Sequence, residues 1–460
     1  MTFQTVLIAN RGEIALRTIE ACRELDLRTI AVYSEADAAM PYLELADASV
    51  CVGPAEPAKS YRNIASIISA AELTGAQAIH PGYGFLAEDP HFVEICEEHG
   101  IIFVGPSVRT MQLVGDKQAA REALSEAGVP VLPGGLAPED GDALLELAET
   151  IGYPLLLKPV YGGGGRGMRL VSSPEALHSM AAGSRAEAKA ASGDARLYLE
   201  RAVSEPRHVE VQILADGEGR IVHLGERDCS IQRRHQKMVE ESPAPRLDDE
   251  LRHRLRNAAI VAAKATGYRN AGTVEFLVDG DRNFYFVEMN ARIQVEHSVS
   301  EAVTGTNLIV EQLKIAGEEP LQAGREEMAL HGHAIECRIT AEDPARGFAP
   351  SCGTVRIQEL PGGNNVRVDT ALFDGMHMSP HYDSLLAKIV TWGRVREEAR
   401  VRMLTALERF RVSGVATTAA FLREVISHPA FRRGEQTTGF VGRLLEDSAA
   451  DRRPSSEVDS

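Results

Sequence analysis

One segment of the chain reads Val274-Glu-Phe-Leu-Val-Asp-Gly-Asp-Arg-Asn-Phe-Tyr-Phe-Val-Glu-Met-Asn290, in which two apolar arms flank a polar, turn-like centre. This pattern predicts a β-hairpin. A turn centred just before Arg282 sets an antiparallel register that places Glu275 opposite Glu288. The same register pairs Thr273 with Asn290, so side chains with oxygen atoms meet on the hairpin.

The predicted glutamate pair is suited to a divalent cation. Two carboxylates held as cross-strand neighbours repel each other by roughly 3 to 4 kcal/mol at an effective dielectric of about 20. A cation removes that cost, and oxygen ligands suit Mg²⁺ that bridges nucleotide phosphates. We therefore expect Glu275, Glu288 and Asn290 to form a metal site. The alternatives are an exposed hairpin whose acids meet by chance, and a register shifted by an insertion in the turn.

The other face of the hairpin is expected to pack on a core and so to fix the register. Its members are Val274, Phe276, Val278, Tyr285, Val287 and Met289. After Glu288 the alternation continues, with polar side chains at Asn290, Arg292, Gln294 and Glu296. This alternation predicts one extended strand face that carries five functional groups. A solvated edge strand alternates in the same way and is the alternative.

A glycine-rich run, Gly162 to Gly167, follows a predicted strand that carries Lys158. It matches G-x-G-x-x-G by count, but another strand follows it, where the dinucleotide-binding fingerprint requires a helix. The P-loop pattern also fails, because methionine follows the last glycine. Glycine backbone can approach a triphosphate closely, and Arg166, Lys158 and Lys117 add positive charge. We expect a flap over a nucleotide, with a plain structural linker as the alternative.

The predicted order of strands and helices divides the chain into three units. Short strands alternate with helices over residues 1–115, which predicts a doubly wound, Rossmann-like α/β unit. Hairpins dominate residues 116–332, which predicts an α+β nucleotide-binding unit with a lid at about 132–203. A mixed α+β unit is expected at 333–446, and a frayed polar tail at 447–460.

Composition excludes some classes of function. The formal net charge of −17 over 460 residues argues against a broad nucleic-acid or anionic membrane surface. The six cysteines lack metal-ligand spacing and are expected to be buried, reduced thiols. The N-terminus begins with a predicted strand instead of a signal peptide, and no apolar run is long enough to span a bilayer. We expect a cytoplasmic protein.

An ordered series of motifs runs along the chain: Ala9-Asn-Arg-Gly-Glu-Ile-Ala-Leu-Arg17, His80-Pro-Gly-Tyr-Gly-Phe-Leu86, Gly115-Asp-Lys117, Gly162-Gly-Gly-Gly-Arg-Gly-Met168, Arg207-His-Val-Glu210, Glu226-Arg-Asp-Cys-Ser230, Gln232-Arg-Arg-His-Gln-Lys237, Glu288 to His297 and Glu336-Cys-Arg-Ile339. Each motif is weak alone. Together they resemble the biotin carboxylase branch of the ATP-grasp superfamily over nearly the whole chain, to about residue 445.

The resemblance implies a role for many single residues. It implies ATP contacts at Lys117, Lys158, Gly164, Gly165, Glu200, Arg201, Ala202, Val203, His208 and His235, in addition to the metal ligands above. It implies bicarbonate contacts at Lys237, Arg292, Gln294 and Val295, with Glu296 as general base. Arg338 would hold the ureido oxygen of biotin, and Tyr83 would contact substrate. Arg338 as a structural ion-pair partner, and His208 or His235 as strand-face histidines, are the alternatives.

The activity implied is ATP-dependent carboxylation of biotin by bicarbonate, through carboxyphosphate, as the first half-reaction of an acetyl-CoA or related acyl-CoA carboxylase. None of the eight lysines lies between two methionines, as a biotin-bearing lysine would. Biotin is therefore expected on a separate carrier protein, with carboxyltransferase subunits as further partners and a homodimer as the assembly. The final carboxyl acceptor is not encoded in this chain.

Three positions depart from the family pattern: Ala291 stands where Thr or Pro is common, Ser298 where Pro or Thr is usual, and Tyr161 where many subunits have a small residue. None of the three supplies a predicted ligand, so the departures concern lid dynamics more than reaction type. Two other functions are kept as alternatives. One is an ATP-grasp ligase with another acceptor, and the other is an ATP-binding regulatory subunit without activity.

Overall fold

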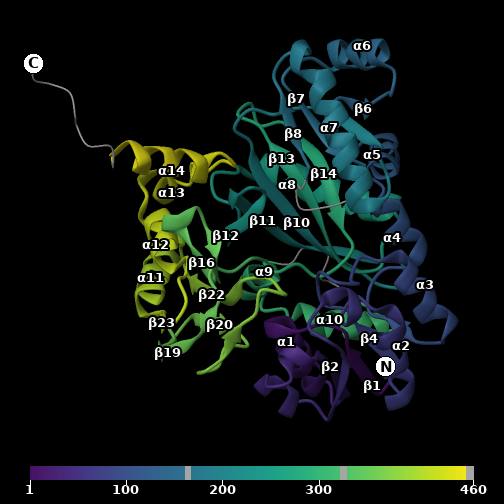
Figure 1. Cartoon of the computed structure of the whole chain (residues 1–460), viewed down its shortest axis with the longest axis vertical. Helices are drawn as coiled ribbons and strands as arrows, with labels where there is room; N and C mark the ends of the chain where they lie inside the picture. Colours follow the sequence, from purple (N-terminus) through teal and green to yellow (C-terminus); the bar gives the residue numbers. More distant parts are fainter. Residues whose placement is uncertain (161–166, 322–328, 452–460) are drawn as a thin grey trace, which may run out of the picture.

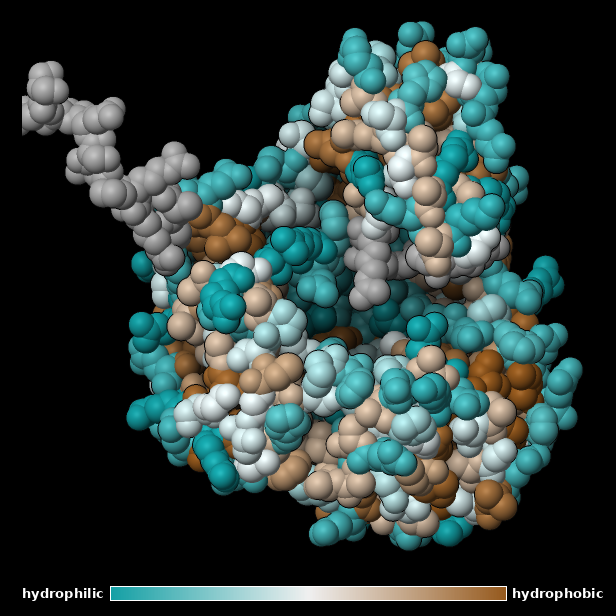
Figure 2. Space-filling model, in the orientation of Figure 1, coloured by the Kyte–Doolittle hydropathy of each residue, from teal (hydrophilic) through white to brown (hydrophobic). Residues whose placement is uncertain are grey.

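The computed structural model describes residues 1–160, 167–321 and 329–451. The expected nucleotide contacts at Gly164 and Gly165, together with Tyr161 and Arg166, lie outside the described residues. Figure 1 shows three lobes, the N-terminal unit, the lid and the C-terminal unit, and the space-filling view in Figure 2 shows a central hollow between them. Hydrophilic side chains line this hollow in the space-filling view (Figure 2).

The N-terminal unit is built on a five-stranded parallel sheet, as its alternating strands and helices predict. In spatial order the strands are β3 (Ala48–Gly53), β2 (Arg28–Ser34), β1 (Thr5–Ile8), β4 (Ala78–His80) and β5 (Ile102–Phe103). The helices are α1 (Gly12–Glu24), α2 (Ile64–Thr74), α3 (Pro90–Glu98) and α4 (Val108–Gly115). Strand β1 is fully buried because helices cover a parallel sheet on both faces.

The lid has its own small sheet and core. After α5 (Lys117–Glu126), the four strands in spatial order are β6 (Gly134–Leu136), β9 (Leu197–Arg201), β7 (Leu155–Pro159) and β8 (Arg169–Val171), with helices α6 (Gly141–Ile151) and α7 (Pro174–Ser192). Leu144, Leu157 and Leu177 belong to its apolar cluster. The predicted hairpin around the glycine run is confirmed, since Leu155 lies opposite Val171.

The main sheet has eight antiparallel strands. In spatial order they are β14 (Phe284–Asn290), β13 (Asn270–Val278), β10 (Arg207–Ala215), β11 (Ile221–Arg233), β12 (Gln236–Ser242), β15 (His333–Thr340), β22 (Leu385–Gly393) and β20 (Val366–Asp369). Helices α8 (Asp249–Ala265), α9 (His297–Thr304) and α10 (Leu308–Ala316) belong to the same region. The sheet runs without a break from β12 to β15, across the expected boundary at residue 333.

The C-terminal unit adds short strands and helices to this sheet. They are β16 (Glu342–Asp343), β17 (Ala349–Pro350), β18 (Gly353–Thr354), β19 (Arg356–Glu359), β21 (His377–Met378), β23 (Arg411–Ser413), α11 (Arg396–Arg409), α12 (Ala419–Ser427), α13 (Pro429–Arg433) and α14 (Phe440–Asp451). The polar tail was expected to begin at residue 447, but α14 continues to Asp451.

The predicted hairpin forms with the predicted register at its functional end, where Glu275 lies opposite Glu288 and Thr273 opposite Asn290. Toward the turn a bulge shifts the register, so that Phe276 lies opposite Phe286. The expected core face is therefore right for Val274, Phe276, Val278 and Met289 and wrong for Tyr285 and Val287. Phe284 and Phe286 are buried in their place, because one extra residue moves each following side chain to the other face.

Two other expectations are wrong. Strand β14 ends at Asn290, and residues 291–296 form bends and a turn before α9 instead of one extended face. Cys51 and Cys352 are exposed, although the other four cysteines are buried and all six are free. Among the described helices, none combines the length and apolar character needed to cross a membrane.

Candidate active site

Charged side chains from consecutive strands of the main sheet meet at the hollow. Cross-strand pairing places Glu288 opposite Glu275, Glu275 opposite Glu210, and Glu210 opposite Arg227. One row thus crosses β14, β13, β10 and β11. Side chains directly opposite one another point to the same face of a sheet, so this row brings three carboxylates and one guanidinium together.

Lys237 on β12 joins three carboxylates. Its Nζ lies 2.5 Å from Glu210 Oε2, 2.8 Å from Glu275 Oε1 and 2.7 Å from Glu296 Oε1. Burial lowers the pKa of Lys237, but the charges of these glutamates outweigh burial and hold it well above the ordinary value. The ammonium group is therefore charged, and the predicted bicarbonate-binding lysine lies beside the predicted base.

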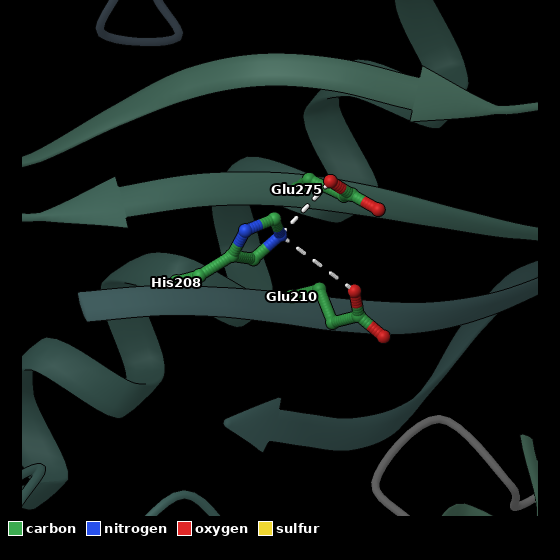
Figure 3. Close-up of side chains that lie close together, drawn as sticks. All are labelled: His208, Glu210 and Glu275. Atoms are coloured by element: carbon green, nitrogen blue, oxygen red, sulfur yellow. Dashed lines mark ion pairs between the residues drawn. The ribbon is translucent and has the colours of Figure 1, made fainter. Parts of the chain in front are cut away.

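Glu275 is held by donors on both of its oxygens. Its Oε1 accepts hydrogen bonds from Asn290 Nδ2 at 2.9 Å and from Gln294 Nε2 at 2.8 Å. Its Oε2 lies 2.9 Å from His208 Nε2, and Figure 3 shows the ring of His208 directed between Glu275 and Glu210. The motif around Arg207 drew attention only to His208, but Glu210, two residues later on the same strand, faces the site as well.

Glu288 has a different environment. No described residue donates a hydrogen bond to its carboxylate. Burial raises the pKa of Glu288, the charge of Glu275 raises it further, and Lys117 opposes both. A divalent cation between these two carboxylates would relieve the repulsion. One ligand-type atom from each of His208, Glu210 and Glu275 also lies within 4.8 Å of the others, so Glu210 is a metal-ligand candidate that the sequence did not single out.

Glu296 and Arg338 form the other end of the site. Arg338 Nη2 donates to Glu296 Oε2 at 2.7 Å and lies 2.6 Å from Glu240 Oε1. Burial raises the pKa of Glu296, but the charges of Lys237, Arg338 and Arg227 outweigh burial and hold it well below the ordinary value. Glu296 is therefore ionised and able to accept a proton. The sequence did not predict Glu240, since its partner Arg338 is about 100 positions away.

The loop between β14 and α9 is fixed by contacts from three directions. Arg292 Nε lies 3.0 Å from Glu88 Oε2, and its Nη2 is 3.3 Å from Asn290 Oδ1. Lys388, which is completely buried on β22, donates to the backbone oxygen of Val295 at 2.9 Å. Arg292 and Val295, for which bicarbonate contacts were expected, both belong to this loop, which ends at Glu296.

Arg227 is a buried arginine that donates hydrogen bonds to several side chains of the site, a role that the sequence did not predict. Its Nε donates to Glu210 Oε1 at 2.5 Å, and its Nη1 donates to Gln212 Oε1 at 2.7 Å and to Ser300 Oγ at 3.0 Å. Its Nη2 donates to Thr273 Oγ1 and to Gln294 Oε1. Arg227 is completely buried and therefore holds Glu210 and Gln294 in place from within the protein.

Several of the expected nucleotide residues belong to the lid sheet, and Lys117 on α5 lies near both the lid and the main sheet. Lys158 on β7 pairs with Glu200 on β9, and Arg121 Nη1 donates to the same carboxylate at 2.7 Å. Burial lowers the pKa of Lys117, which the charges of Glu288 and Glu200 counteract. The charge of Lys117 therefore interacts both with Glu200 in the lid and with Glu288 in the main sheet.

The remaining predicted residues are more loosely tied to this cluster. Burial and the charges of Lys158 and His208 lower the pKa of His235. Arg201 is exposed at the end of β9, and Ala202 and Val203 follow it, with the backbone of Ala202 bonded to Pro154. Tyr83 donates to Glu13, beside Lys388, instead of to a residue at the centre of the site.

Fold and site together define an ATP-grasp ligase: a parallel N-terminal sheet, a lid, and an antiparallel sheet with paired carboxylates. Three family models match the chain in order. They are the biotin carboxylase N-terminal domain at residues 2–111, the ATP-binding domain of the carbamoyl-phosphate synthase L chain at 116–324, and the biotin carboxylase C-terminal domain at 336–443.

Whole-length relatives agree with these matches. A biotin carboxylase of Nostoc is 49% identical over 446 residues, which cover 96% of this chain and 100% of that protein. The structure of Campylobacter jejuni biotin carboxylase with β,γ-ATP superposes with a TM-score of 0.93 at 46% identity, covering 96% of this chain and 99% of that one. The chain belongs to the biotin carboxylase family.

A further solved structure shows the same fold with ligands. The biotin carboxylase domain dimer of Hydrogenobacter thermophilus 2-oxoglutarate carboxylase, in complex with MgADP, ADP and bicarbonate, superposes with a TM-score of 0.93 at 44% identity. It covers 97% of this chain and 98% of that one.

Proposed function

We propose that the chain carboxylates biotin with bicarbonate and ATP, through carboxyphosphate, giving carboxybiotin, ADP and phosphate. The observation that carries this function is the chain of contacts from Lys237 to Glu296 to Arg338. It joins an anion-binding cation, an ionised base and a second cation within one buried cluster. A simple ATP-binding module has no need of this arrangement.

The ATP end of the site would hold the nucleotide between lid and sheet. Lys117 and Lys158 supply positive charge for the phosphates, and Glu200 orients Lys158. Glu275 and Glu288, with Asn290, would hold Mg²⁺ or Mn²⁺, and the lack of a described donor at Glu288 supports this fit. When bound, the metal supplies charge stabilisation at the phosphoryl group that is transferred.

The bicarbonate end would activate a poor nucleophile. Lys237 donates to Glu296, and Arg292, Gln294 and Val295 belong to the same loop as Glu296, so these four residues would hold bicarbonate beside the base. Glu296 would take the bicarbonate proton as the oxygen attacks the γ-phosphate. The two cations offset the negative charge that develops. Closure of the lid would exclude water from the carboxyphosphate.

The biotin end would depend on Arg338. Carboxyphosphate releases CO₂ and phosphate, and the phosphate can take the N1 proton of biotin. Arg338 would then stabilise the negative ureido oxygen, with Tyr83 nearby as a substrate contact. The Coulomb attraction of a guanidinium for this oxygen is strong in a buried site.

Partners follow from the same chemistry. Biotin would be presented by a biotin carboxyl carrier protein, and carboxyltransferase subunits would move the carboxyl group to the final acceptor. A homodimer is the proposed assembly, in line with the dimer in the Hydrogenobacter structure, and the cytoplasm is the proposed compartment. Relatives from a separate biotin carboxylase and from a 2-oxoglutarate carboxylase are similarly close, so the acceptor is left to the partner subunits.

Release of ADP tests the function directly. With Mg²⁺ and bicarbonate present, we expect free biotin to increase the rate of ADP release. ATP binding without any stimulation by biotin would instead favour a ligase with another acceptor. Absence of all bicarbonate-dependent turnover would favour a regulatory subunit.

Glu288→Gln should weaken the response to the metal. One of two opposed carboxylate ligands is lost while side-chain volume is kept, so the Mg²⁺ concentration for half-maximal ADP release should rise at least about 10-fold. A Mg²⁺ titration measures this. The control is Glu218→Gln, which alters an exposed turn residue between β10 and β11. An unchanged midpoint in Glu288→Gln would remove this residue from the metal site.

A further inference from the structure

A second pair of carboxyl groups lies behind Arg338. Glu240 on β12 and Glu336 on β15 are directly opposite each other, and both side chains are completely buried. Arg338 follows Glu336 by two residues, so both point to the same face of β15. No role was predicted for either glutamate, and the proposed reaction does not use them.

The nearby cations are too few to neutralise this pair. Arg338 is shared between Glu240 and Glu296, and Lys237 is committed to Glu296 and two further acids. Lys388 is closest to Glu13 and Asp369, at 3.3 and 3.5 Å. Within the described parts of the chain, Glu336 has no ion pair of its own.

Hydrogen bonding is incomplete as well. Glu240 Oε1 has only its ion pair with Arg338, at 2.6 Å, while Glu240 Oε2 and Glu336 Oε1 are buried and accept no hydrogen bond from a described residue. Ser298 on α9 donates to Glu336 Oε2. A buried carboxylate without donors is costly, whereas a protonated carboxyl group can bond to its neighbour.

We propose that Glu240 and Glu336 share one proton at neutral pH, and that the resulting single negative charge leaves Arg338 able to attract an anionic substrate oxygen. The proposal rests on the biotin carboxylation proposed above. The two glutamates are positioning residues, since they act on substrate only through Arg338. Ser298 donates a hydrogen bond to one member of the pair, Glu336.

Electrostatics support a shared proton. At a separation of 4 Å, two full charges would repel by about 4 kcal/mol at an effective dielectric of 20, and one proton removes that repulsion. Burial raises the pKa of Glu240, Arg338 and Lys237 lower it, and Glu336 and Glu296 raise it.

For Glu336, burial likewise raises the pKa, Lys388, Arg338 and the hydroxyl of Ser298 lower it, and Glu296 raises it. The thiol of Cys229 lies near Glu240, whereas Cys337 points to the other face of β15; burial raises the pKa of both thiols, so they stay neutral.

The protonation of Glu240 and Glu336 determines how biotin carboxylation should depend on pH. Both carboxyl groups have pKa values above the ordinary range, so the pair keeps its proton at neutral pH and loses it as pH rises. The second negative charge then holds Arg338 more strongly. Carboxylation of biotin should therefore fall on the alkaline side, whereas the step at bicarbonate depends on other residues.

Infrared spectroscopy tests the proton itself. The intact protein should show a carbonyl stretch from a buried, protonated carboxyl group at pH 7, which disappears as pH rises. Glu240→Gln and Glu336→Gln should each lack this titrating band. The control is Glu241→Gln, because this buried neighbour pairs with His333 and Arg396 and is held ionised, with a pKa of about 2. A missing band in the parent protein, or one that survives in both variants, would overturn the proposal.

Kinetics test the consequence for Arg338. In the parent, kcat/KM for biotin should fall by about tenfold per pH unit above the pKa of the pair, and in Glu336→Gln this fall should vanish. Bicarbonate-dependent ADP release without biotin should keep its pH profile in both proteins. An unchanged alkaline fall in a folded Glu336→Gln protein would contradict the role. A parent without biotin stimulation would instead reject the proposed function, while the infrared result would still report on the proton.

Discussion

Glu296→Gln is expected to bind ATP normally and to lose bicarbonate-dependent ADP release by about 10²- to 10⁴-fold, the range for removal of a general base. Glutamine keeps the shape of the side chain and its contact with Arg338, but it cannot take the bicarbonate proton. ADP release measures turnover, and titration calorimetry with ATP measures binding.

The matched control for Glu296 is Glu98→Gln, which changes an exposed glutamate at the end of α3 and should leave both quantities unaltered. Full turnover in Glu296→Gln would show that another group is the base. Loss of ATP binding together with turnover would show that the substitution disturbs the lid and sheet instead.

Arg227→Met should have the largest effect on stability. The guanidinium is completely buried and donates to five side chains from four segments of the chain. Its removal leaves Glu210 buried without one of its two cations. Breaking such a pair costs about 3 to 5 kcal/mol of unfolding free energy. Urea unfolding of the variant and the parent measures the difference.

A double variant separates charge from shape at this position. Arg227→Met with Glu210→Gln removes the stranded charge as well, so it should regain part of the stability that the single variant loses. A single variant less than about 1 kcal/mol below the parent would show that Arg227 contributes little, as is common for exposed pairs.

Local patterns in the sequence predicted much of the fold. Turn chemistry and apolar arms were enough to place Glu275 opposite Glu288, because a hairpin joins strands that are close along the chain. The parallel N-terminal sheet and the hairpin around the glycine run followed in the same way. The residues expected at the bicarbonate site came from the resemblance to the family, and the structure places Lys237 2.7 Å from Glu296.

Such local patterns did not predict contacts between strands that are far apart in the sequence. Nothing in the alternation of polar residues reveals that β12 pairs with β15, yet this pairing brings Glu240 and Arg338 together. Arg227 resembles any arginine on a strand until its five acceptors are assembled. The expected extended face after Asn290 failed for a related reason, since tertiary contacts from Glu88 and Lys388 hold that segment as a loop.

The bulge next to Glu288 bears on how this hairpin tolerates change during evolution. In a regular hairpin, one residue added to or lost from the turn would invert every following side chain. Here the bulge already separates the pairing at Glu275 from the pairing near the turn. If the turn gains or loses a residue, the bulge can move or disappear, and the pairing of Glu275 with Glu288 is kept. The exposed turn at residues 280–283 can therefore change in length while the two glutamates keep their spacing.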